Sequence, residues 1–253
     1  MNAALAAAAT LVAVAFALST LDRWGRKRRP HELAWTVSLA LFALGAGALW
    51  WAESRGWSLA SFRVFFVAGA VLNVPWLALG TVYLLAGETA GDRIRAWLIG
   101  LSGLSVGIVL FAPTNAAVTG SELPTGTDVF GVAPRVLAGV GSGVAAVVII
   151  AGAVWSAIRV LRHRSPALGT VRRTPVAPGR LVAGNLLIAA GTLVLSASGT
   201  LAGRLGKDRA FAITLLVGIV ILFAGFLVAS TPARSLQAVK AQATKQPEQE
   251  AAS

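Results

Sequence analysis

The hydrophobic positions of this chain form seven long stretches that short polar segments separate. The stretches cover residues 2–21, 32–52, 62–86, 94–111, 135–160, 181–201 and 210–230. An α-helix needs about 20 apolar residues to cross a hydrocarbon core of roughly 30 Å. The pattern therefore predicts an all-α fold, a polytopic membrane bundle of seven transmembrane helices in one domain, residues 1–230.

The two ends of the chain differ in character. No Lys or Arg precedes the first stretch, whereas five basic residues follow it, which is the reverse of a cleaved signal peptide. We therefore expect residues 2–21 to be a retained helix. Residues 231–253 are rich in Gln, Glu, Lys and Ala and cannot bury a core, so a disordered cytoplasmic tail is expected there.

Basic residues gather in every second gap between the stretches. The gaps after the first, third and fifth stretches, together with the tail, hold most of the 22 Lys and Arg residues. Loops rich in Lys and Arg stay on the cytoplasmic side of a membrane. This bias predicts an N-terminus outside and a C-terminus in the cytoplasm, in a bacterial plasma membrane.

The net charge of +12 and the pI near 11.7 would fit a nucleic-acid-binding protein if the chain were soluble. Only 13% of the residues are charged, however, and the mean hydropathy is +0.74. The basic residues flank apolar stretches, so we expect anionic lipids as partners and no nucleic acid. The residues expected to contact lipid headgroups are Arg26, Lys27, Arg28, Arg29, Arg162, Arg164, Arg172 and Arg173.

The chemistry available to the chain is narrow. There is no cysteine, and the two histidines, His31 and His163, are expected in basic loops. No ionisable residue is expected near the middle of a stretch, which argues against a proton pump or an intramembrane carboxylate enzyme. The last stretch, residues 210–230, has no lysine for a retinal Schiff base. No nucleotide, serine-hydrolase or zinc-protease motif can be read. We expect no enzyme activity, cofactor or metal.

Uncharged polar residues in the third stretch are the most distinctive. Pro75 lacks an N–H, so a kink is expected there that frees the carbonyl of Val71. Asn73 could bridge to the next helix. One interpretation is a hinge or a small polar pocket, and the other is a structural kink that packing satisfies. The candidate residues are Asn73, Pro75, Trp76, Thr81, Tyr83 and Asn185.

Glycine pairs at helical spacing predict close helix contacts. They are Gly103 with Gly107, Gly139 with Gly143, and Gly199 with Gly203. Ser102 and Ser105 lie in the middle of the fourth stretch, where they could line a solute path with Asn73 or join helices by hydrogen bonds.

Two resemblances to known families follow from these residues. The three-one-three division of the stretches is similar to the SWEET sugar transporters. The run Leu33-Ala34-Trp35, the pair Trp50-Trp51, Phe62-Arg63, Pro75-Trp76 and Thr81-Val82-Tyr83 resemble, over residues 31–85, the seven-transmembrane sensor region found before some bacterial histidine kinases. As a whole, the chain resembles small seven-helix integral membrane proteins of actinobacteria.

The sequence thus favours a sensor-like module or an accessory subunit of a membrane assembly, with a membrane protein as partner. The alternative is a passive transporter of a small neutral solute through a three-plus-one-plus-three helix bundle.

Overall fold

The computed structural model describes residues 2–120, 122–162, 178–201 and 207–230, and all of their regular elements are helices. The elements are α1 (Asn2–Lys27), α2 (Pro30–Arg55), α3 (Leu59–Phe65), the π-helix η1 (Phe66–Leu72), α4 (Asn73–Ala86), α5 (Glu88–Phe111), α6 (Gly126–Val129), α7 (Val132–Arg162), α8 (Pro178–Leu201) and α9 (Lys207–Ser230). One isolated antiparallel bridge joins Thr114 and Phe130. The predicted all-α class is confirmed.

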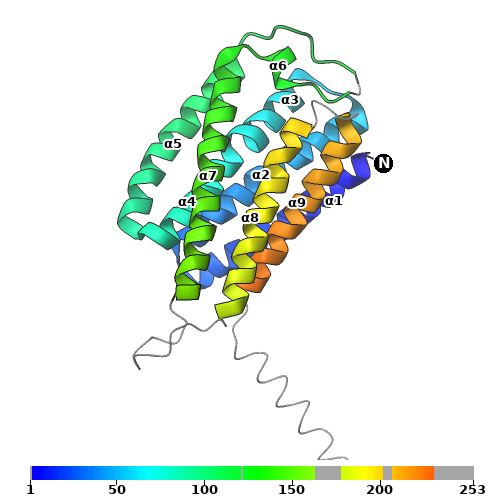
Figure 1. Ribbon diagram of the computed structural model, residues 1–253. Helices are drawn as coiled ribbons and strands as arrows, with labels where there is room; N and C mark the ends of the chain where they lie inside the picture. Colours follow the sequence, from blue (N-terminus) through cyan, green and yellow to red (C-terminus); the bar gives the residue numbers. More distant parts are fainter. Residues whose placement is uncertain (1, 121, 163–177, 202–206, 231–253) are drawn as a thin grey trace, which may run out of the picture.

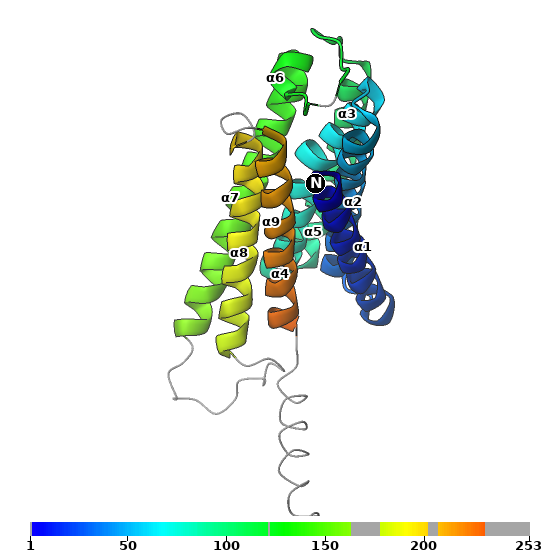
Figure 2. The same ribbon diagram turned by 90° about the vertical axis from the view of Figure 1, so that its right-hand side faces the viewer.

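The long helices lie side by side and run alternately in opposite directions (Figures 1 and 2). The α1–α2 and α4–α5 connections lie at one end of the bundle, which we call the α1–α2 end. The α2–α3 connection and residues 112–120 and 122–131 lie at the other end. Helices α1 and α5 occupy opposite flanks in Figure 1, so α5 is remote from the N-terminal helix.

Six helical segments among the described residues are long and apolar enough to cross a membrane. They are Ala3–Lys27, Pro30–Arg55, Leu59–Ala86, Glu88–Phe111, Val132–Ser156 and Ala210–Val228. In α8 the described apolar stretch, Leu186–Leu195, is shorter. The chain is therefore a multi-pass membrane protein.

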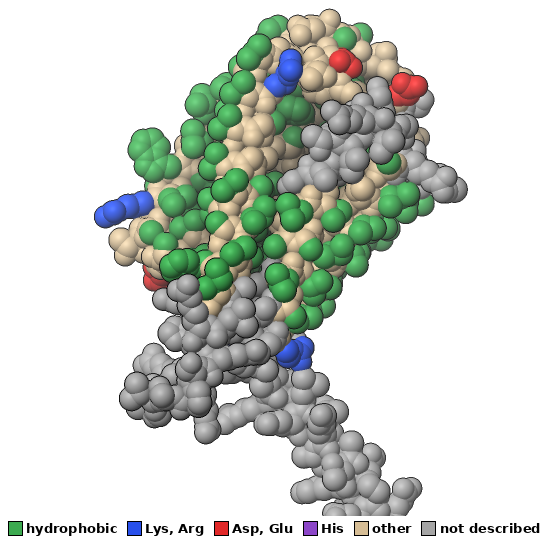
Figure 3. Space-filling model, in the orientation of Figure 1, with side chains coloured by type: hydrophobic (Ala, Val, Ile, Leu, Met, Phe, Trp, Pro, Cys, Tyr) green, Lys and Arg blue, Asp and Glu red, His purple; other side chains and the backbone are tan. Residues whose placement is uncertain are grey.

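Apolar side chains cover the middle of the bundle, and charged side chains lie toward the ends of its helices. Figure 3 shows hydrophobic side chains over the middle of one face, while the charged side chains drawn in colour lie toward the ends of the helices. Many large apolar side chains are exposed, among them Leu11, Trp97 and Phe111. Such exposure fits a lipid-facing surface.

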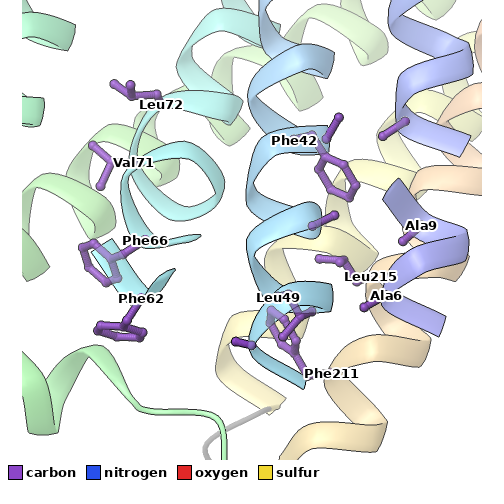
Figure 4. Packing of buried hydrophobic residues seen from close by; sticks show 14 of the residues in the cluster. Ala6, Ala9, Phe42, Leu49, Phe62, Phe66, Val71, Leu72, Phe211 and Leu215 are labelled. Atoms are coloured by element: carbon purple, nitrogen blue, oxygen red, sulfur yellow. The ribbon is translucent and has the colours of Figure 1, made fainter. Parts of the chain in front are cut away.

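The buried core joins the two halves of the sequence. In Figure 4, Phe42 and Leu49 of α2 face Leu215 and Phe211 of α9, with alanines of α1 beside them. All of these belong to one buried cluster, which extends to aromatic residues of α3 and η1 and to Phe130. The alanines let α1 lie close against α2, because a methyl side chain keeps two helices near each other.

Local signals set where the helices begin. Pro30 is the first residue of α2, where its missing N–H costs nothing, and Arg29 before it is extended. Ser58 and Ser61 form a reciprocal cap at the start of α3. The helices reach a few residues beyond the apolar stretches, as in α1, which continues to Lys27. Hydropathy marks the apolar part, whereas backbone hydrogen bonding continues into the polar turns. The expected tail, residues 231–253, lies outside the described residues.

Glycine contacts occur at positions other than the expected pairs. A Cβ added to Gly103, Gly107, Gly139 or Gly143 would meet nothing within 4 Å, so these residues are not contact points within the chain. The third pair lies where side-chain surroundings are not described. The closest helix approaches instead involve Gly191 and Gly225, between α8 and α9, where an added Cβ would lie less than 3 Å from backbone atoms. The sequence did not predict the α8–α9 contact, because the spacing of glycines does not show which face of a helix has a neighbour.

Candidate functional site

The polar segment of the third predicted span lies at a change of helix type. Phe66–Leu72 is a π-helix, and the N–H of Asn73 donates to the carbonyl of Ala68, five residues back. In the same register the donor for Ala70 would be Pro75, which has no N–H. The carbonyl of Ala70 accepts a hydrogen bond from Ser142 Oγ of α7 at 2.6 Å instead. The sequence predicted a freed carbonyl one residue later, at Val71.

Helix α7 packs closely beside this irregular turn. A Cβ on Gly141 would lie 3.9 Å from both the Pro75 ring and the Val71 carbonyl oxygen. The neighbouring Ser142 can therefore reach the Ala70 carbonyl. Backbone groups that a π-helix or a proline leaves open in a membrane are tolerated where a neighbouring helix satisfies them, and α7 does so here.

Asn73 joins α4 to α2. Ser38 Oγ lies 2.9 Å from the Asn73 carbonyl oxygen and 2.9 Å from Asn73 Oδ1, so its hydroxyl donates toward both acceptors. Ser38 is 1% exposed and Asn73 is 8% exposed. The polar contact is thus enclosed between two helices.

Trp76 and Tyr83 join α4 to α5. The Trp76 Nε1–H donates to Ser102 Oγ at 3.2 Å, and Ser102 donates in turn to the Leu98 carbonyl at 2.6 Å. The Tyr83 hydroxyl donates to Asp92 Oδ1 at 2.8 Å, which also lies 3.2 Å from Arg95 Nη2. These contacts hold α5 at its middle and at the α1–α2 end.

The candidate pocket residues do not converge on one space. Asn73 contacts α2, Trp76 and Tyr83 contact α5, and Pro75 lies beside α7. Thr81 also faces α7, because its methyl group would lie 2.6 Å from a Cβ added to Gly152. Asn185 lies in α8, and its side chain is outside the described part of the chain. The described residues of the set surround α4 and link it to three neighbours.

The residues expected at lipid headgroups are placed in part. Arg26, Lys27, Arg28 and Arg29 are exposed at the α1–α2 end. There Arg26 pairs with Asp22 at 3.0 Å, and the Arg28 guanidinium lies 4.7 Å from the Trp24 ring centre. Arg162 ends α7, with its side chain not described, and Arg164, Arg172 and Arg173 lie outside the described residues.

A buried acidic residue at the same end escaped the sequence analysis. Glu32, in the first turn of α2, is 6% exposed, and its Oε2 has no hydrogen-bond partner. His31 Nε2 lies 3.8 Å from Glu32 Oε1. Arg23, Lys27 and Arg29 add positive potential at the carboxylate. An acidic residue in the first turn of a helix is common, because its negative charge interacts favourably with the positive end of the helix dipole. The sequence pattern therefore did not distinguish Glu32 from other such residues.

His31 is also not where it was expected. It lies inside α2 rather than in a loop, and its side chain is 15% exposed. Its ring meets the edge of Trp35 with centroids 5.2 Å apart, and Trp35 meets Phe226 of α9 at 5.2 Å. The Arg23 guanidinium of α1 lies 4.3 Å from the Phe226 ring centre. Three helices therefore meet around the His31–Glu32 pair.

Neither clusters of metal-ligating residues nor similarity to known proteins identifies a function for these residues. In the described parts of the chain, no three His, Cys, Asp or Glu residues gather as a metal site would require. Comparison with protein-family models, with curated proteins and with solved structures gives no match to this chain.

Proposed function

We propose that the protein is a non-enzymatic component of a bacterial plasma membrane, a sensor-like module or an accessory subunit of a larger membrane assembly. In this proposal it crosses the membrane seven times, with the N-terminus outside and the C-terminus in the cytoplasm. Its basic segments rest on anionic lipid, and no catalytic step or cofactor is invoked. The similarity of residues 31–85 to histidine-kinase sensor regions supports the sensor-like form.

One observation supports the accessory-subunit form of the proposal: helix α5 is largely exposed. Only 11% of the apolar window in Glu88–Phe111 is buried within the chain, against 44% for Leu59–Ala86. Ala96, Trp97, Gly100, Leu101 and Leu104 line a shallow apolar hollow on this helix.

Open glycines lie along the same helix. A Cβ on Gly100, Gly103 or Gly107 would meet nothing within 4 Å. Small residues on a membrane helix allow the backbone of a second helix to approach closely. A transmembrane helix of a partner protein is the occupant that this face would suit.

The hydrogen bonds of α4 favour this proposal over a passive transporter. Asn73, Trp76 and Tyr83 each bond to a residue of a neighbouring helix. Polar side chains that are used to join helices are not available to replace the water around a passing solute. A transporter that used Asn73 would have to break its contact with Ser38.

The test is native mass spectrometry of the protein taken from its own membrane into lipid particles. We expect a second membrane protein at fixed stoichiometry. We also expect the double variant Gly103→Leu and Gly107→Leu to lose it, because two large side chains hold the partner helix away. The matched control is Ala15→Leu on α1, an exposed position at the opposite flank of the bundle. The control should keep the partner.

Other outcomes count against the proposal. A bound small solute without any protein partner would favour the transporter, and uptake that Asn73→Leu abolishes in a folded protein would support that alternative. Retention of the partner by the double glycine variant would show that α5 is not its docking face.

A further inference from the structure

His31 and Glu32 lie where helices meet, but their side chains form no hydrogen bond with each other. The 3.8 Å between His31 Nε2 and Glu32 Oε1 exceeds hydrogen-bond length. Glu32 Oε2 has no donor at all, although the residue is 6% exposed. A buried carboxylate oxygen without a donor loses the solvation that it had in water, so a nearby group that can become a donor is significant.

Protonation of His31 would supply that donor. In the tautomer that carries its hydrogen on Nδ1, Nε2 takes up a proton from water at the α1–α2 end. The imidazolium then donates from Nε2 to the carboxylate of Glu32, which keeps its negative charge. A charge-assisted hydrogen bond of this kind is shorter than the present separation, so the ring must move toward Glu32.

The charges around the pair oppose one another. Burial of the ring opposes protonation of His31 most, and the positive charge of Arg29 adds to this opposition. An ionised Glu32, 3.8 Å away, would favour the proton. From α1, Arg23 and Lys27 also place positive charge near the carboxylate.

Helices α4 and α9 pack against Trp35 beside the pair, and Tyr83 of α4 lies in a buried cluster with Ala34 of α2. In the described residues, α4 contributes Gly80, and α9 contributes Phe226. The response to pH therefore depends on the burial of the pair, on Glu32 and on the cations of the α1–α2 connection.

Movement of His31 would reach the neighbouring helices through Trp35. The His31 ring lies against the edge of this indole. The indole in turn lies over Gly80 of α4, where an added Cβ would overlap the ring, and meets Phe226 of α9 edge-on. Trp35 has no spare room on the Gly80 side, so a shift of His31 changes its packing.

We propose that His31 and Glu32 form a proton-binding site that couples the pH at the α1–α2 end to the packing of α2 against α4 and α9. The site is independent of the proposed accessory role, because it rests on contacts within this chain alone.

The first test is NMR of the full chain in lipid nanodiscs, with label only in histidine. The chain has two histidines, so His31→Gln and His163→Gln assign both signals. We expect the His31 signal to titrate. We also expect Glu32→Gln to lower its proton affinity by about tenfold or more, because the opposite charge is removed. A His31 titration unchanged by Glu32→Gln, or no titration in the folded protein, would overturn the proposal.

A second variant tests the same electrostatics without depending on whether Glu32→Gln folds. Arg29 is exposed, and Arg29→Gln removes a repelling charge without disturbing the buried pair. We expect this variant to raise the proton affinity of His31 several-fold. An unchanged or lowered affinity would count against the proposed electrostatics.

Coupling to Trp35 needs its own readout. We expect tryptophan fluorescence to change through the His31 titration, with the change lost in His31→Gln and in Trp35→Phe but kept in His163→Gln. A change that survives Trp35→Phe would place the response elsewhere. No change at all, while the His31 signal titrates, would show proton binding without coupling and would overturn the second half of the proposal.

Discussion

Single hydroxyl groups satisfy the backbone where the third predicted span is irregular. Ser142 donates to the Ala70 carbonyl from α7, and Ser38 donates to Asn73 from α2. Neither serine was among the candidate residues, because an isolated Ser in an apolar stretch carries no sign of what it faces. The two serines hold the π-helix and the start of α4 between their neighbours.

Replacing Ser142 tests this role. We expect Ser142→Ala to lower the free energy of unfolding by about 1 kcal/mol, because the Ala70 carbonyl loses its donor inside the membrane. Thermal unfolding in nanodiscs measures the change. Ser54→Ala is the control, since Ser54 is exposed and bonds only within its own helix, to the Trp50 carbonyl. An equal effect in both variants would contradict the specific role of Ser142.

Helix pairs differ in how they are held together. Helices α8 and α9 touch backbone to backbone through Gly191 and Gly225. Helix α5 instead is held to α4 by hydrogen bonds from Trp76 and Tyr83, and its open glycines face away. The first arrangement needs glycine, while the second leaves a face free for lipid or a partner.

A larger side chain at Gly191 should separate α8 from α9. A Cβ there would lie 2.7 Å from the backbone N of Leu222 and 3.0 Å from its Cα, and backbone cannot move aside as a flexible side chain can. We expect Gly191→Val to destabilise the protein by about 1–3 kcal/mol. The control is Gly139→Val on α7, where nothing lies within 4 Å. Similar unfolding temperatures for the two variants would contradict the close contact.

At the scale of the whole molecule, the two ends of the bundle carry different kinds of residue. The α1–α2 end carries the cluster of exposed basic residues and the buried Glu32, with the partly buried His31 beside it. The opposite end carries the aromatic cluster of Phe62, Phe66 and Phe130, and Val118 and Leu123 belong to the same buried core. In the proposed orientation, the α1–α2 end and the proposed proton-binding site lie on the cytoplasmic side.

The orientation can be tested directly because the chain has no cysteine. We expect Thr119→Cys to react with a membrane-impermeant maleimide on intact cells, since residues 112–131 lie outside in the proposed topology. We expect Gln237→Cys to react only after the cells are permeabilised. The opposite result would reverse the topology and place the His31–Glu32 pair on the outer side. Reaction of both residues on intact cells would contradict the odd number of spans.

The sequence predicted the long helices more fully than the contacts between their side chains. The apolar stretches lie within long helices because apolar length is a property of consecutive residues. Asn73 and Pro75 were singled out because an amide and a proline in an apolar run are visible locally, and a π-helix ends directly before Asn73. Glu32 was missed because its burial is a result of tertiary packing, which the sequence around it does not show.

The sequence by itself determined that this is an all-helical, multi-pass membrane protein, since backbone groups in lipid must be paired within each segment and apolar length sets which segments cross. Only the tertiary structure decided which carbonyl Pro75 leaves open, which glycines touch a neighbour, and that His31 and Glu32 are enclosed beside Trp35. Those outcomes depend on which face of each helix meets another helix. That choice is made by packing between residues far apart in the chain, and no local pattern contains it.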